Sequence, residues 1–161
     1  MQLLKASYKS PEVAGKRGFE DLECFKLALD VVVNAHAFAR TLPPEEKYDL
    51  AMQIRRAAKS VTANIAEGYG RYHYLDGLKF YSNARGSLNE VLGHLVNAKV
   101  LNYCEQEYFD TFYMLIRRTE KALNGFMNYV RQQKAGEDAS GSRTLREESA
   151  EYEITNETEI P

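Results

Sequence analysis

The chain has few of the residues that interrupt helices. Its 161 residues include only four prolines and ten glycines, whereas residues that favour helices are abundant, and this favours an all-helical fold. No apolar run approaches the roughly 18 residues needed to cross a bilayer. The first residues are followed by polar ones, so the start lacks the apolar middle of a signal peptide. We therefore expect a cytoplasmic protein without membrane association.

Cysteine and histidine are also scarce. Cys24 and Cys104 show no spacing typical of a metal or redox site, and one pair is a poor argument for a disulfide. We interpret them as partly buried thiols in a reducing compartment. Glu90 and His94 lie four residues apart, whereas a di-iron bundle needs two Glu-x-x-His pairs and two further glutamates. We expect no metal and no cofactor.

A strong excess of charge is absent, but the charge is unevenly distributed. Residues 135–161 contain eight acids and two arginines, a net charge of −6. Subtracting this from the whole-chain charge of −2 leaves +4 for residues 1–134. A mildly basic body with an acidic tail is compatible with a polyanion partner.

Four long segments with apolar residues at spacings of three and four predict helices over about 21–41, 45–68, 76–101 and 105–133. Asp21 would cap the first helix, and Pro43-Pro44 would separate it from the second. Short turns make neighbouring helices antiparallel, which predicts an all-α, up-down-up-down four-helix bundle. We expect residues 1–18 to form a flexible arm, residues 19–134 the bundle, and residues 135–161 a disordered acidic tail.

The second predicted helix carries a polar stripe beside its apolar one. Its polar residues could face polar residues of the third helix. Because buried charges cost several kcal/mol unless they are paired, we predict one hydrogen-bonded structural network that sets register and subunit specificity. We expect Glu67→Ala to destabilise or disassemble the protein. The predicted network comprises Arg56, Ser60, Asn64, Glu67, Arg85, Ser87 and Glu90.

Basic residues at two places make a candidate nucleic-acid interface. Tyr69, Tyr72 and Tyr74 lie among the first group and could stack on bases. The alternative is a solvated helix face with tyrosines at subunit contacts. The candidate residues are Arg55, Lys59, Arg71 and Lys79 around the second and third helices, and Arg117, Arg118, Lys121 and Arg131 on the fourth.

Signals of catalysis are weak. Gly68-x-Gly70 lacks the third glycine of a dinucleotide-binding loop and follows no predicted strand. Helical ribonucleases of the higher-eukaryote-and-prokaryote nucleotide-binding class have an arginine four to six residues before a histidine, but Asn89 stands five residues before His94. No nucleophile–base pair can be assigned. We therefore predict no catalytic residues, no enzymatic activity and no small-molecule substrate.

Short motifs over residues 19–133 resemble one known family, the bacterial four-helix proteins encoded in intervening sequences of 23S ribosomal RNA genes. Its relatives include the accessory variability determinant proteins of diversity-generating retroelements. The motifs are Phe19-Glu-Asp-Leu22, Pro43-x-x-Glu46, Gln53-Ile-Arg-Arg-Ala57, Ser60-x-x-x-Asn64-Ile-Ala-Glu-Gly68, Gly70-Arg71 and Ala84-Arg-Gly-Ser87-x-x-Glu90.

The resemblance implies a homopentameric, barrel-like assembly of bundles. For the retroelement relatives it also implies nucleic-acid binding and association with a reverse transcriptase. Two features depart from the pattern: the retroelement relatives are strongly basic, whereas residues 1–134 carry only +4, and Tyr72-His-Tyr74 stands where small polar residues are expected.

These observations lead to one hypothesis and one alternative. The hypothesis is a non-enzymatic, ring-like homo-oligomer that binds RNA or DNA, or acts as an accessory protein to a partner such as a reverse transcriptase. Eleven tyrosines and the small residues of the second and third helices exceed what one small bundle must bury, which favours self-association. The alternative is a purely structural or protein-interaction module without nucleic-acid binding.

Overall fold

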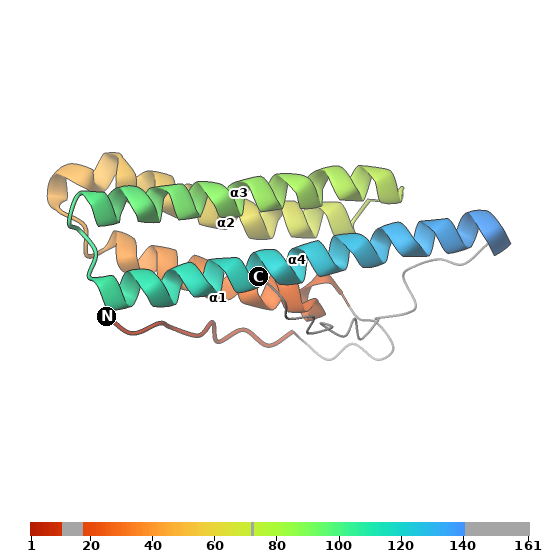
Figure 1. Ribbon diagram of the computed structural model, residues 1–161, viewed down its shortest axis with the longest axis horizontal. Coiled ribbons are helices and arrows are strands. Elements are labelled where there is room, and N and C mark those ends of the chain that lie inside the picture. Colours follow the sequence, from red (N-terminus) through yellow and green to blue (C-terminus); the bar gives the residue numbers. More distant parts are fainter. Residues whose placement is uncertain (11–17, 72, 141–161) are drawn as a thin grey trace, which may run out of the picture.

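The computed structural model describes residues 1–10, 18–71 and 73–140, and these residues contain four long helices, two short 3₁₀ helices and no strand. The four long helices lie side by side along the long axis of the molecule (Figure 1). The predicted all-α fold with four helices is therefore confirmed. In chain order the elements are η1 (Phe19–Asp21), α1 (Glu23–Ala39), η2 (Pro44–Tyr48), α2 (Leu50–Tyr69), α3 (Tyr74–Val100) and α4 (Gln106–Ser140).

The core lies between all four helices. Helix α1 packs against α2 and α4, and α3 packs against the same two helices. Phe38, Ile54, Leu95 and Phe112, one from each helix in turn, are at most 2% exposed. Burying a side chain of this size contributes about 1.5–3 kcal/mol. None of the helices in the described ranges is long and apolar enough to span a membrane.

The ends of the first two helices differ from the predictions. Asp21 does not cap α1 but lies in η1, where its carboxylate accepts hydrogen bonds from Ser10 Oγ (3.1 Å) and the Gly18 amide (3.4 Å). Helix α2 begins at Leu50 rather than at residue 45, because Asp49 has φ −116° and ψ −107°, outside the helical region. The Glu46 side chain accepts a hydrogen bond from the Leu50 amide at 3.2 Å and so satisfies one of the free donors of this helix end.

Gly68 allows α2 and α3 to approach closely rather than only ending α2. A Cβ atom at this position would lie 2.6 Å from Tyr81 Cε1 and 3.0 Å from the Gly77 carbonyl oxygen. Helix α3 begins at Tyr74, two residues earlier than predicted, and continues unbroken through Gly86. The following turn contains Asn102 with φ 60°, a left-handed conformation that asparagine tolerates.

The two ends of the described chain also differ from the predictions. Helix α4 continues to Ser140, so the predicted boundary at residues 133–135 lies inside it; the rest of the predicted tail lies outside the described residues. Within the predicted arm, residues 4–6 hydrogen-bond to α1, because Asp30 and Asn34 on this helix are buried polar residues that need partners.

Candidate nucleic-acid interface

The predicted polar network is reduced to a small link between α2 and α3. Ser87 Oγ lies 2.9 Å from Ser60 Oγ, within hydrogen-bond distance, and 3.1 Å from the Asn83 carbonyl oxygen. Asn64 Nδ2 donates to Ser60 at Oγ (3.1 Å) and at the carbonyl oxygen (2.8 Å). Ser60, Asn64 and Ser87 therefore form the part of the predicted network that does join the two helices.

The four charged members do not join this link, so the prediction of one continuous network is wrong. Glu67 pairs with Arg71, which follows the end of α2, and Glu90 Oε1 lies 3.7 Å from His94 Nε2 on α3. Arg85 reaches Asn124 of α4 at 3.3 Å, whereas the exposed Arg56 has no hydrogen-bond or ion-pair partner in the described part of the chain. The physical reason is that charges cost less at a solvated surface than in a core.

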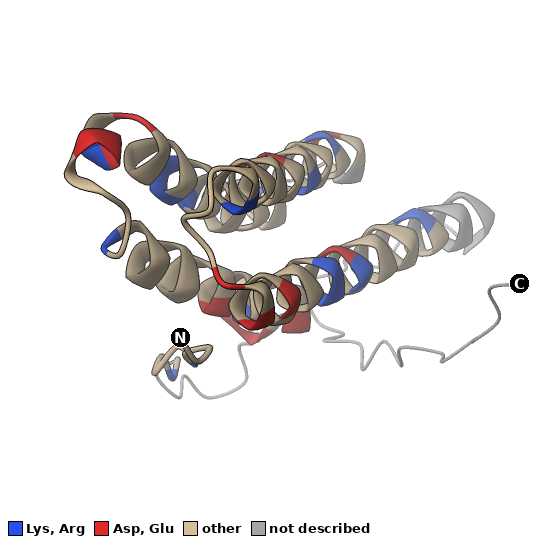
Figure 2. Cartoon of the chain, turned by 60° about the vertical axis from the view of Figure 1, so that its left-hand side comes forward, with Lys and Arg blue, Asp and Glu red and all other residues tan. Residues whose placement is uncertain are grey.

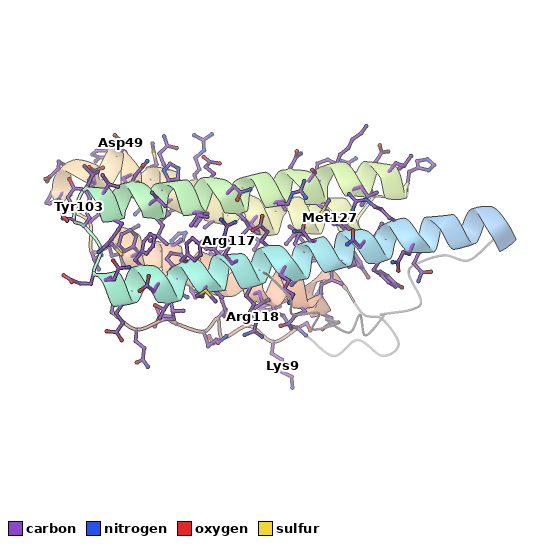
Figure 3. The ribbon with its side chains drawn as sticks, in the orientation of Figure 1. Lys9, Asp49, Tyr103, Arg117, Arg118 and Met127 are labelled. Atoms are coloured by element: carbon purple, nitrogen blue, oxygen red, sulfur yellow. The ribbon has the colours of Figure 1, made fainter. Side chains whose placement is uncertain are left out.

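Most of the predicted phosphate-binding residues are paired within the chain. Arg71 pairs with Glu67 and lies over the Phe80 ring, with Cζ 4.5 Å from the ring centroid, and Lys79 Nζ lies 3.7 Å from Asp76. On α4, Arg117 pairs with Glu120 at 2.8 Å, and Arg118 lies 3.6 Å from Glu23 of α1 (Figure 3). Arg131 donates to Asn128 at 2.9 Å, while the exposed Lys121 has no such partner among the described residues.

Along helix α4, acidic residues lie among the basic ones. Basic residues occur on several helices, and on α4 an acidic band lies within the basic stretch (Figure 2). Hydrogen bonds first to Tyr113 and then to Glu120 raise the pKa of Arg117, so neighbours on its own helix stabilise its charged guanidinium group. These exposed pairs add little stability, but each places a neutralising group next to a cation.

A different arrangement lies where α1 meets α2. Arg40 follows the last residue of α1, Arg55 and Lys59 lie on α2, and the half-buried His36 of α1 is close enough to feel the charges of all three. Among the described residues, the side chains of Arg40, Arg55 and Lys59 have no hydrogen-bond or ion-pair partner. We call His36, Arg40, Arg55 and Lys59 the α1–α2 basic cluster.

His36 reports the field of this cluster. Burial lowers its pKa, and the positive charges of Lys59, Arg55 and Arg40 lower it further. Its Nε2 atom is buried and has no hydrogen-bond partner in the described ranges. All three charges that shift the pKa of His36 are positive, and each disfavours the protonated imidazole.

The cluster has the chemistry of an anion site. Two guanidinium groups and one ammonium group can donate several hydrogen bonds to phosphate oxygens. The sequence analysis included Arg55 and Lys59 but missed Arg40 and His36. Their spacing of four residues, which places both on one side of the first helix, is the signal that could have found them.

The predicted stacking tyrosines receive little support. Tyr69 packs edge-on against Phe19, with ring centroids 6.3 Å apart, and is only partly exposed. Tyr72 and the side chain of Tyr74 lie outside the described residues. Cys24 and Cys104 are buried thiols, and the described residues contain no group of three or more side chains arranged to hold a metal ion.

Comparison with known proteins identifies the fold family. The model of the 23S rRNA-intervening sequence protein family matches residues 20–125, which include α1, α2 and α3 completely and most of α4. A search of curated proteins found no match.

Proposed function

The chain belongs to the family of 23S rRNA-intervening sequence proteins, and from this premise we propose that it is a non-enzymatic accessory protein that binds nucleic acid. The observation that carries the proposal is the α1–α2 basic cluster. Arg40, Arg55 and Lys59 all lower the pKa of His36, and the side chain of each lacks an acidic partner among the described residues. A phosphate backbone supplies the missing anions.

The cluster predicts a modest, salt-sensitive affinity. If Arg40, Arg55 and Lys59 each neutralise one phosphate, log K falls with log salt with a slope of about −2 for a single strand and about −3 for a duplex. Such contacts position a backbone and carry no base information. We therefore propose binding without strong sequence preference.

We further propose that the helices form an antiparallel up-down-up-down bundle that assembles into a ring-like homo-oligomer, with a pentamer favoured, in the cytoplasm. The short connections between helices support the bundle topology. Apolar residues exposed near one end of α2 and α3, namely Met52 (41%), Val96 (41%) and Val100 (75%), support a subunit contact. The retroelement resemblance suggests a reverse transcriptase as the protein partner.

The alternative function is a structural or protein-interaction module without nucleic-acid binding. A specific observation favours it: Arg71, Lys79, Arg117 and Arg118 already have carboxylate partners within the chain. A surface neutralised in this way has little charge left for phosphates, so the choice between the two functions depends on the α1–α2 basic cluster.

Fluorescence anisotropy with labelled single-stranded and duplex RNA and DNA, over a series of salt concentrations, tests the proposal. We expect the wild-type chain to bind at low salt and R40Q/R55Q/K59Q to bind about tenfold or more weakly, with a salt slope smaller in magnitude by about 2 on single strands. The matched control, R71Q/K79Q/R117Q, removes the same charge from paired positions and should bind nearly as well as the wild type. Circular dichroism checks that both variants are folded.

The outcomes separate the two functions. Absence of binding by the wild type at low salt would reject the nucleic-acid function and leave the interaction module. Equal weakening by the two triple variants would show that net charge matters and that the α1–α2 basic cluster does not. Sizes from light scattering or native mass spectrometry test self-association, and a purely monomeric wild type would reject the ring.

A further inference from the structure

Two buried polar residues interrupt the apolar face of α1. Asp30 is 7% exposed and Asn34 is completely buried, although apolar residues such as Leu27 and Val31 surround them on the same helix. A buried carboxylate or amide is costly unless its polar atoms are hydrogen-bonded. Neither residue belongs to the α1–α2 basic cluster, and both have partners in another part of the chain.

Apart from a hydrogen bond within α1, from Asn34 Nδ2 to the Asp30 carbonyl oxygen at 2.7 Å, the partners of these two side chains are residues 4–6 of the same chain. The Leu4 amide donates to Asn34 Oδ1 at 2.8 Å, and Asn34 Nδ2 donates back to the Leu4 carbonyl oxygen at 2.8 Å. The Ala6 amide donates to Asp30 Oδ1, and Lys5 Nζ donates to Asp30 Oδ2, both at 2.8 Å. Three of these four bonds engage the backbone of the N-terminal segment.

The spacing of the two side chains matches an extended peptide. Asp30 and Asn34 lie four residues apart on a helix, an axial rise of about 6 Å. Leu4 and Ala6 lie two residues apart in an extended chain, which spans about 6.6–6.8 Å. One helical turn can therefore contact alternate residues of a peptide that runs antiparallel to the helix, with Asn34 binding Leu4 and Asp30 binding Ala6.

Side chains add selectivity to this backbone pairing. Leu3 is partly buried and packs against the hydrophobic core, whereas Leu4 is 49% exposed. Lys5 supplies the cation for Asp30, with its own side chain 77% exposed and that of Asp30 only 10% exposed. The segment thus combines an apolar anchor, a backbone pair and a lysine within four residues.

We propose that α1 carries a peptide-binding site, formed by Asp30 and Asn34, whose ligand is an extended Leu-Leu-Lys-Ala segment, and that residues 3–6 of the chain occupy it as a separable strap. The strap covers Asp30 and Asn34 and satisfies their polar atoms. This inference does not rest on the proposed function, because it involves no nucleic acid and no basic residue of the α1–α2 basic cluster.

A peptide added in trans tests the site in the full-length chain. The double variant L3D/K5E removes the apolar anchor and sets a carboxylate at position 5 against Asp30, and we expect this repulsion to release the strap even though its backbone donors remain. We expect a fluorescent peptide of residues 1–10 to bind this variant saturably. The same peptide carrying Lys5→Glu should bind about tenfold or more weakly, since it loses a charge-assisted hydrogen bond.

The wild-type chain is the matched control. Its own strap occupies the site at an effective concentration in the millimolar range, so labelled peptide should bind it much more weakly than it binds L3D/K5E. Equal binding to both chains, or no binding to a correctly folded L3D/K5E chain, would overturn the proposal.

Amide hydrogen exchange in the unmodified chain gives a second test that needs no variant. The Leu4 and Ala6 amides donate to buried side chains, whereas the Lys5 amide has no hydrogen-bond acceptor in the described part of the chain. We expect the exchange of Leu4 and Ala6 to be at least about tenfold slower than that of Lys5. Three equal, unprotected rates would show that the strap is not docked and would overturn the proposal.

Discussion

Helix α1 has two polar surfaces, and they differ in whether their polar side chains have partners within the fold. Toward residues 4–6, Asp30 and Asn34 are buried, and their side-chain atoms have partners at 2.7–2.8 Å. Toward α2, Arg40 lies next to His36, Arg55 and Lys59, with no acidic partner in the described ranges. The polar atoms of the first surface are therefore hydrogen-bonded within the fold, whereas the positive charges of the second surface remain available to bind an anion. The state of the polar groups, rather than their number, separates a structural surface from a candidate binding surface.

Replacing Asn34 with leucine should give the largest change in stability and tests whether the surface toward residues 4–6 is structural. The variant loses the reciprocal pair with Leu4 and leaves backbone groups unsatisfied, so we expect the free energy of unfolding to fall by about 1–3 kcal/mol. Urea denaturation measures this loss. Asn97→Leu, at an exposed position of α3, is the matched control and should change stability by no more than about 0.5 kcal/mol.

The affinity for nucleic acid should not change with this loss of stability. We expect Asn34→Leu to bind labelled RNA as the wild type does under conditions where both are folded, because the α1–α2 basic cluster is untouched. Equal stability of Asn34→Leu and Asn97→Leu would remove the structural role of the first surface. A loss of RNA affinity in folded Asn34→Leu would show that the two surfaces of α1 are not independent.

The helices were predictable from the sequence, but the two surfaces of α1 were not. Apolar spacing reflects local geometry, so it located all four helices. Residues 4–6 show no period, and their bonds to Asp30 and Asn34 join positions 24–30 residues apart. Only a tertiary structure brings such positions together.

The candidate site was partly predictable for the same reason. Arg55 and Lys59 share one helix, so their proximity follows from spacing alone. Arg40 and His36 come from another helix and join them only through the packing of α1 on α2. Sequence spacing also could not decide which basic residues are neutralised across helices, as Arg118 is by Glu23 at 3.6 Å.

The acidic residues that follow α4 in the sequence allow a test of whether the α1–α2 basic cluster is available to phosphates. Residues 141–161 contain six glutamates and two arginines, a net charge of −4. If this charge competes with phosphates for the α1–α2 basic cluster, a chain ending at Ser140 should bind RNA a few-fold more tightly at low salt, and the difference should vanish at high salt. A full-length chain with residues 141–161 scrambled is the control and should match the wild type. Unchanged affinity of the shortened chain would reject competition.

The pH dependence of stability tests the positive field at the cluster. The pKa of His36 in the folded chain lies below the ordinary 6.5, so between these two values the unfolded chain binds more protons. The free energy of unfolding should therefore fall as the pH falls through this window, and it should level off above about 6.5–7. His36→Gln should flatten the profile there. R40Q/R55Q/K59Q should flatten it in part, since burial remains; an unchanged slope in both variants would contradict the assignment.

The smallest effect is expected for Glu67→Ala, a substitution that the continuous network predicted to destabilise or disassemble the protein. In the structure, Glu67 is exposed, and its one ion-pair partner among the described residues is the exposed Arg71, just beyond the end of α2. Exposed pairs of this kind contribute about 0.3–0.5 kcal/mol, so denaturation of Glu67→Ala should nearly match the wild type. Ser87→Ala is the contrasting variant, because it removes the contact with Ser60 across α2 and α3 and should cost about 0.5–1.5 kcal/mol. If Glu67→Ala were instead the more destabilised of the two, the exposed carboxylate would have a structural partner beyond its own helix, such as a neighbouring subunit. Exposure in a single chain would then no longer distinguish a structural surface from a candidate binding surface.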